Sequence, residues 1–122
     1  AMIVTQALLP LLKLGSRSRI VMISSDMGSI AKSISGQFVD APAYRMSKAA
    51  MNMGAAHLAD ELQNQNITVL TLHPGHVVTD MGGENAPVSV EESTTGLFTV
   101  IDKANLSHTG NFIDWKGNVL AW

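Results

Sequence analysis

The chain of 122 residues is 46% hydrophobic and 15% charged, and its formal net charge is −2 at pH 7. This balance provides no basic surface for nucleic acid or an anionic membrane, and no apolar run is long enough to span a bilayer. The lack of cysteine excludes disulfides, thiol catalysis and cysteine-ligated metal, and no other metal site is expected. We therefore predict a single cytoplasmic domain over residues 1–122.

The first half of the chain alternates helix-like and strand-like patterns. Apolar residues three and four apart predict a helix over residues 2–14, and an apolar, β-branched run at residues 19–25 predicts a strand buried on both faces. Residues 26–42 are rich in glycine, serine and single apolar residues, so we predict a long loop there. A strong helical period over residues 43–63 predicts the longest helix.

The second half continues the alternation. Residues 67–72 form another apolar run with the pattern of a buried strand. Ser89, followed by Glu91 and Glu92, marks the start of a helix that should end near residue 104, and residues 110–115 predict a short third strand. Since strands alternate with helices, we predict an α/β fold with about three parallel strands and flanking helices.

Three side chains in this arrangement suit one reaction. Tyr44 and Lys48 lie about one helical turn apart on the same face, so the ammonium can stabilise the ionised phenol. Ser25 lies where the first strand ends, and its hydroxyl can donate a hydrogen bond to a substrate oxygen that gains negative charge. The combination predicts carbonyl reduction or alcohol oxidation on a small molecule.

Four motifs follow one another along the chain: Ser24-Ser25, Tyr44-Arg45-Met46-Ser47-Lys48, Pro74-Gly75 with Thr79, and the tail from Gly110 to Trp122. In this order they resemble the short-chain dehydrogenase/reductase family, and within it the small carbonyl reductases of the C-factor or sniffer type. The resemblance implies a partial Rossmann-like sheet, with Tyr44 as proton donor and with Ser25, in preference to Ser24, orienting the substrate. It also implies NADP or NAD as cofactor, with contacts from Tyr44, Lys48, Pro74, Gly75, Val77 and Thr79.

One part of the family pattern is missing. No G-x-G-x-x-G or T-G-x-x-x-G-x-G sequence follows a strand, so the glycine-rich turn that binds the pyrophosphate is absent. The resemblance therefore implies the C-terminal catalytic portion of the fold, either as a piece of a longer enzyme or as a natural shortened relative. The first would be an NAD(P)-dependent oxidoreductase. The second would be a cofactor-free isomerase or cyclase that uses acid/base catalysis on an oxygenated metabolite, or a non-catalytic dimerising module.

The resemblance also bears on partners. The family's strand order would leave one edge of the first strand free, which implies a homo-oligomer, most simply a dimer, that covers this edge. The middle of the longest helix is rich in small residues, which fit either the equivalent helix of a partner or the sheet of the same chain; they are Ala49, Ala50, Gly54, Ala55 and Ala56.

Five further residues carry expectations about the pocket and its surroundings. The segment 26–42 should lie over the pocket, with Phe38 and Val39 as apolar contacts. Asp26 is either a loop cap or an acid that faces Tyr44 and opposes Lys48. Trp115 and Trp122 are expected to anchor the packing at the C-terminal end of the chain.

Overall fold

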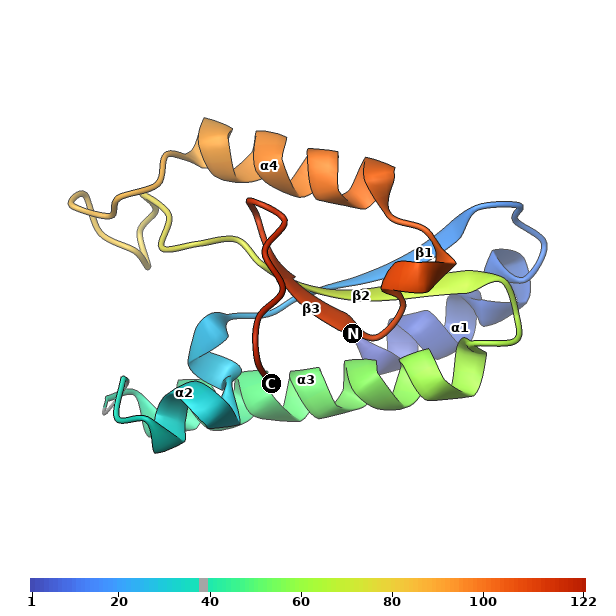
Figure 1. Ribbon diagram of the computed structural model, residues 1–122, viewed down its shortest axis with the longest axis horizontal. Helices are drawn as coiled ribbons and strands as arrows, with labels where there is room; N and C mark the ends of the chain where they lie inside the picture. Colours follow the sequence, from blue (N-terminus) through green and yellow to red (C-terminus); the bar gives the residue numbers. More distant parts are fainter. Residues whose placement is uncertain (38–39) are drawn as a thin grey trace.

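The computed structural model describes residues 1–37 and 40–122 (Figure 1). Three parallel strands form one sheet in the order β1-β2-β3. The strands are β1 (Ser18–Ile23), β2 (Ile67–His73) and β3 (Asn111–Asp114), and the helices are α1 (Met2–Leu12), η1 (Asp26–Gly28), α2 (Ile30–Ile34), α3 (Pro42–Leu62), α4 (Val90–Lys103) and η2 (Leu106–His108). The predicted α/β fold with three parallel strands is confirmed.

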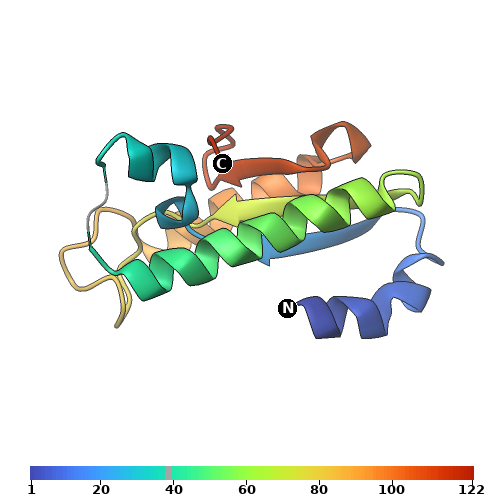
Figure 2. The same ribbon diagram turned by 90° about the horizontal axis from the view of Figure 1, so that it is seen from below.

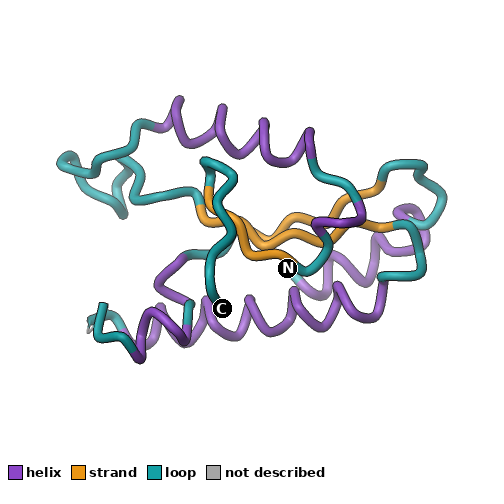
Figure 3. The backbone as a smooth tube through the Cα atoms, in the orientation of Figure 1, coloured by secondary structure: helices purple, strands orange, loops and turns teal. Residues whose placement is uncertain are grey.

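The helices cover both faces of the sheet. α4 lies on one face, and α1 and α3 lie together on the other, so the molecule has three layers (Figures 1 and 2). Loops gather at the two ends of the strands (Figure 3). Among the residues that the structure describes, no helix combines the length and the apolar character needed to cross a membrane.

Local sequence explains where the two longest helices, α3 and α4, begin. The Ser89 hydroxyl accepts a hydrogen bond from the Glu92 N–H, and the Glu92 carboxylate accepts one from the Ser89 N–H, which is the capping box predicted at the start of α4. The hydrogen bonds from the main chain and hydroxyl of Ser89 lower the pKa of Glu92. Pro42 opens α3, where the missing N–H of proline costs no helical bond.

The core lies in two layers, one on each face of the sheet. The residues between the sheet and α3 are Ile20, Met22, Ala55, Leu58, Ala59, Leu62, Ile67 and Val69, and those on the α4 side are Leu70, Leu72, Ala104 and Ile113. The central strand β2 is therefore buried on both faces, as its continuous apolar sequence predicts.

The prediction that the first strand is buried on both faces is wrong. In β1 only Ile20 and Met22 are buried, and the Ile23 side chain is 45% exposed. The reason is position in the sheet, because β1 pairs with β2 on one side and has no strand on the other among the described residues. An edge strand is covered less completely than a central one.

The predicted loop over residues 26–42 contains two short helices instead. Ser25 caps η1 by accepting from the Met27 N–H, and Ser29 caps α2 by accepting from the Lys32 N–H. Serine at these N-cap positions was the available signal, and each helix is too short for a hydrophobic period to reveal it. Phe38 and Val39 lie outside the described residues.

The end of the chain closes the outer edge of β3. Val119 forms an antiparallel bridge with Ile113, and the Leu120 N–H donates to the Phe112 carbonyl at 2.8 Å. Trp122 stacks on Phe112 with ring centroids 5.2 Å apart, so its predicted packing role is confirmed. The Trp122 carbonyl also accepts from the Ala31 N–H at 3.0 Å, which ties this segment to α2.

Two glycines on the α3 side of the sheet provide a matched test of the packing. A Cβ on Gly28 would lie 2.8 Å from main-chain and Cβ atoms of Lys48, whereas a Cβ on Gly54 would meet only the flexible Met2 side chain at 3.4 Å. We expect Gly28→Ala to destabilise the fold by about 2 kcal/mol, as overpacking does. Gly54→Ala should stabilise it by up to about 1 kcal/mol through helix propensity. Urea unfolding measures both, and equal effects would contradict this packing.

Candidate functional site

The predicted site residues gather at the carboxyl ends of β1 and β2. Both strands run toward the same end of the sheet, where the N-terminal part of α3 and the loop after β2 also lie (Figure 1). The close approach of Gly28 to Lys48 fixes the distance between η1 and α3 at this end. In open α/β sheets, ligands bind in the crevice outside the carboxyl ends of the strands.

The two adjacent serines have different environments. Ser24 is 2% exposed, and its hydroxyl donates to the Asn52 side-chain oxygen at 2.5 Å, while the Asn52 amide donates to the Gly28 carbonyl at 3.3 Å. The Ser25 hydroxyl accepts from the Met27 N–H at 3.2 Å, and its own proton has no acceptor among the described residues. Ser24 therefore holds α3 against η1, and only Ser25 has a proton free to donate.

Lys48 joins the end of β1 to Tyr44. Its ammonium donates to the Ile23 carbonyl at 3.2 Å and lies 5.6 Å from the centroid of the Tyr44 ring. Both side chains are half-buried, and the Tyr44 hydroxyl has no hydrogen-bond partner in the described part of the chain. The structure thus brings Lys48 to Tyr44 and to the end of β1, two residues before Ser25. No hydrogen bond between described residues links Ser25 directly to Tyr44 or Lys48.

The loop after β2 is held by its own hydrogen bonds. The Pro74 carbonyl accepts from the Ser93 hydroxyl at 2.7 Å, which fixes the loop to α4. Gly75 has a φ of 88°, and a Cβ there would lie 2.8 Å from the Trp115 indole nitrogen. This contact with Trp115 is sufficient reason for glycine at position 75, independent of any ligand.

Farther along the same loop, the Thr79 hydroxyl is hydrogen-bonded within the loop, whereas the Val77 N–H is not. The Thr79 hydroxyl donates to the Val77 carbonyl at 3.2 Å and accepts from the Gly82 N–H at 3.1 Å, so its only proton is engaged within the loop. The loop bridges to residue 88 through the N–H of Val78 and the carbonyl of His76. The Val77 N–H has no acceptor among the described residues, and it is therefore available to a ligand.

Sequence reasoning missed a polar cluster beside Ser25. The Asp26 carboxylate binds the Lys32 ammonium at 2.8 Å and lies 3.5 Å from His73 Nε2, and the Asp26 N–H donates to His73 Nδ1 at 3.3 Å. Asp26 therefore neither caps the loop with its side chain nor faces Tyr44, so both expectations for it were wrong. The available signal was His73 itself, a titratable residue at the end of a buried strand and directly before proline.

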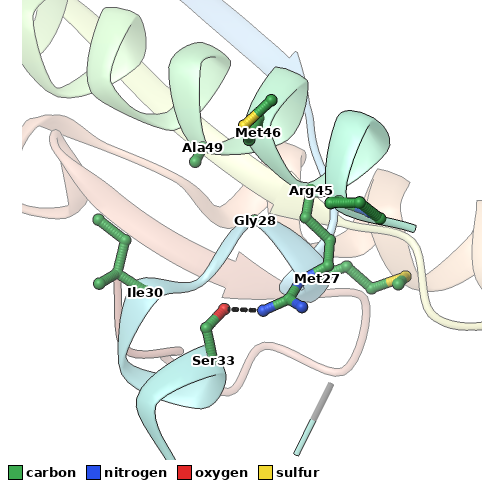
Figure 4. Close-up of a pocket in the computed structure, with 8 residues that line it drawn as sticks. Met27, Gly28, Ile30, Ser33, Arg45, Met46 and Ala49 are labelled. Carbon is green, nitrogen blue, oxygen red and sulfur yellow. Dashed lines mark hydrogen bonds between the residues drawn. The ribbon is translucent and has the colours of Figure 1, made fainter. Parts of the chain in front are cut away.

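A cavity of about 200 Å³ lies next to this site (Figure 4). Its walls come from η1, α2 and the first turns of α3, and they consist of Met27, Gly28, Ile30, Ser33, Pro42, Arg45, Met46 and Ala49. Arg45 donates to the Ser33 hydroxyl across it. The cavity contains none of Ser25, Tyr44 and Lys48, because Arg45 and Ala49 lie on the neighbouring face of α3.

Comparison with known proteins gives consistent matches. The family model described as short chain dehydrogenase matches residues 1–88. The C-signal protein of Myxococcus xanthus is 41% identical over 119 residues, which cover 98% of this chain and 70% of that protein.

Two solved structures are similar over nearly the whole chain. The NADPH-bound carbonyl reductase from chicken fatty liver matches with a TM-score of 0.89 and 37% identity, over 99% of this chain and 52% of that one. The carbonyl reductase Sniffer of D. melanogaster matches with a TM-score of 0.84 and 36% identity, over 97% and 51%. The chain thus spans about half the length of these structures, and the predicted partial Rossmann-like sheet is confirmed.

The different environments of the two serines lead to a stability prediction. Ser24→Ala leaves the buried Asn52 oxygen without a donor, which should lower the free energy of unfolding by about 1–3 kcal/mol. Ser25→Ala removes one cap hydrogen bond of a short helix and should cost less, at most about 1 kcal/mol. Urea denaturation of the two variants compares them directly. An equal or larger loss for Ser25→Ala would contradict the assignment of Ser24 as the structural serine.

Proposed function

The chain belongs to the short-chain dehydrogenase family, and from this premise we propose that it forms the catalytic part of an NAD(P)-dependent oxidoreductase acting on a small carbonyl compound. The observation that carries the proposal is the position of Lys48, between the Tyr44 ring and the end of the strand that leads to Ser25. A cytoplasmic location is part of the same proposal.

Tyr44, Lys48 and Ser25 have different roles in the proposed carbonyl reduction. Tyr44 gives its hydroxyl proton to the carbonyl oxygen, and the Lys48 ammonium stabilises the phenolate that remains until a proton returns from solvent. Ser25, whose proton is uncommitted, donates a hydrogen bond to the same oxygen as negative charge develops on it. A bound nicotinamide dinucleotide would supply the hydride for reduction or accept it for alcohol oxidation.

Two polar groups at the site, the Tyr44 hydroxyl and the Val77 N–H, have no partner among the described residues and could bind a nicotinamide dinucleotide. The Val77 N–H has no acceptor in the described structure and could meet a carboxamide oxygen. Tyr44 and Lys48 would contact the ribose, and Pro74, Gly75, Val77 and Thr79 would surround the nicotinamide. Because the Thr79 hydroxyl proton is engaged with the Val77 carbonyl, Thr79 would have to exchange this bond for one to the cofactor. The chicken fatty liver enzyme is described with NADPH, which favours NADP.

Substitution of Tyr44 tests the proton donor. We expect Tyr44→Phe to lower kcat for NADPH-dependent reduction of 4-nitrobenzaldehyde by about 100-fold or more, because the phenol proton is lost while the ring packing is kept. Met46→Leu is the matched control on the same helix, since Met46 is 69% exposed and should leave kcat unchanged. The assay follows NADPH oxidation by its absorbance, and the melting temperature of each variant is measured in parallel.

The same variants distinguish the alternative function. A protein that binds no dinucleotide in calorimetry, yet loses a cofactor-free isomerisation on substitution of Tyr44, would be an acid/base catalyst and would overturn the oxidoreductase proposal. This alternative would use the same three side chains, Ser25, Tyr44 and Lys48, for acid/base catalysis without hydride transfer.

Self-association is the second part of the proposal. α1 packs on the core through Met2, Leu9 and Leu12, but its opposite face is also apolar, with Ile3 82%, Val4 61%, Leu8 46% and Leu11 66% exposed. A helix that is apolar on all sides is normally buried on all sides. We propose that a second copy covers this face together with the free edge of β1. Small residues of α3 are partly used within the chain, since Gly54 meets Met2 and Ala55 is buried.

A charge on the outer face of α1 tests this association. Val4→Glu should shift a homodimer to monomer in sedimentation velocity, because a buried unpaired carboxylate in the interface is costly. Ile34→Glu, at a residue of α2 that is 83% exposed, is the control and should leave the sedimentation coefficient unchanged. A wild-type chain that sediments as a monomer would contradict the proposal.

A further inference from the structure

The hydrogen-bond ladder between β1 and β2 stops beside Ser25. The Ser24 N–H donates to the Leu72 carbonyl at 2.8 Å, and the next bond in a parallel ladder would come from the N–H of residue 74, which proline lacks. The bond after that would join the Asp26 N–H to the Pro74 carbonyl. In this structure the Pro74 carbonyl accepts from the Ser93 hydroxyl at 2.7 Å, and no bond joins it to the Asp26 N–H, which has a different acceptor.

The imidazole of His73 provides this acceptor. The Asp26 N–H donates to His73 Nδ1 at 3.3 Å, and this N–H belongs to the peptide that joins Ser25 to Asp26. Holding the peptide fixes the ψ of Ser25, which is 145° in an extended residue with a φ of −149°. The direction of the Ser25 hydroxyl depends on this backbone conformation, and the Met27 N–H that it accepts reports on it.

An imidazole nitrogen accepts a hydrogen bond only when it carries no proton. Since Nδ1 accepts, the proton of the neutral ring lies on Nε2, which faces an Asp26 carboxylate oxygen at 3.5 Å. Burial is the largest influence on His73 and lowers its pKa below 6.5, and the positive charge of Lys32 acts in the same direction. The carboxylates of Asp26 and Asp114 raise the pKa but do not offset the effect of burial. The ring is therefore neutral near pH 7, and the contact with Asp26 is not an ion pair there.

We propose that His73 is a positioning residue for Ser25, that its neutral ring holds the Ser25–Asp26 peptide in place, and that protonation of the ring releases it. In the protonated ring, Nδ1–H would point at the Asp26 N–H, so two donors would face each other. The consequence for catalysis rests on the proposed function, because it concerns the hydrogen bond from Ser25 to a substrate oxygen. The effect on the Ser25–Asp26 peptide itself does not depend on any activity.

Two substitutions of His73 distinguish the effect of its hydrogen-bond acceptor from the effect of its protonation. His73→Asn keeps an oxygen near the position of Nδ1 but does not ionise, and His73→Leu keeps the bulk but removes the acceptor. Hydrogen exchange by NMR gives the protection of the Asp26 and Met27 amides, corrected for intrinsic exchange, between pH 5 and 8. We expect the wild-type protection of both amides to fall about tenfold as His73 protonates, which corresponds to one lost hydrogen bond. The Asn variant should keep it at every pH, and the Leu variant should lack it throughout.

A kinetic cycle tests the link to Ser25. His73→Leu should lower kcat for reduction of 4-nitrobenzaldehyde about tenfold at pH 7.5 in the wild-type background and have no further effect in a Ser25→Ala background. His73→Asn should remove the loss of kcat at acid pH. Equal losses in both backgrounds would show a merely structural role and overturn the proposal.

The hydrogen-exchange measurement tests the positioning role of His73 independently of catalysis. Wild-type protection that does not change with pH, or that survives in His73→Leu, would overturn the positioning role whether or not the chain is active. If the protection behaves as expected and the wild-type chain reduces no carbonyl compound, the proposed function fails and the role of His73 in holding Ser25 stands.

Discussion

The parallel pairing of β1 with β2, and its abrupt end at Pro74, is the constraint on which the rest of the site depends. Parallel pairing sends Ser24 and His73 out of the sheet at the same end. Proline then stops the ladder, because it has no N–H to donate. The segments that follow β1 and β2 diverge at this point, and their peptide groups must find other hydrogen-bond partners. Those partners are side chains, and they give the site its shape.

α3 brings Tyr44 and Lys48 to the ends of β1 and β2, and buried hydrogen bonds to η1 and Ser24 hold the helix there. The Ser24 hydroxyl and the Gly28 carbonyl both bind Asn52, one turn after Lys48, so the helix is held close to η1 by buried hydrogen bonds. Only a glycine at position 28 permits this approach without displacing the main chain of α3. The result is that Lys48 reaches the last carbonyl of β1 while it remains beside Tyr44.

The division of labour between two adjacent serines follows from the alternation of a strand. Successive side chains point to opposite faces, so the Ser24 hydroxyl enters the interface with α3, whereas the Ser25 hydroxyl, in a residue that is 7% exposed, caps η1. The Ser24 hydroxyl donates its proton to Asn52, whereas the Ser25 hydroxyl proton has no acceptor among the described residues. The neutral His73 ring completes this arrangement by binding the peptide that follows Ser25.

The sequence alone determined the elements whose signals are local: the long period of α3, the continuous apolar run of β2, the capping box at Ser89, and the placement of Tyr44 and Lys48 on one helical face. It also favoured Ser25 over Ser24, although only by resemblance. Tertiary structure decided what depends on neighbours distant in the sequence. It made β1 an edge strand with an exposed Ile23, turned Asp26 toward Lys32 and His73 and away from Tyr44, and filled the space at Gly75 with Trp115. Periodicity reports which face of an element is apolar, but it carries no information on which partner from elsewhere in the chain will cover that face or bind a given polar group.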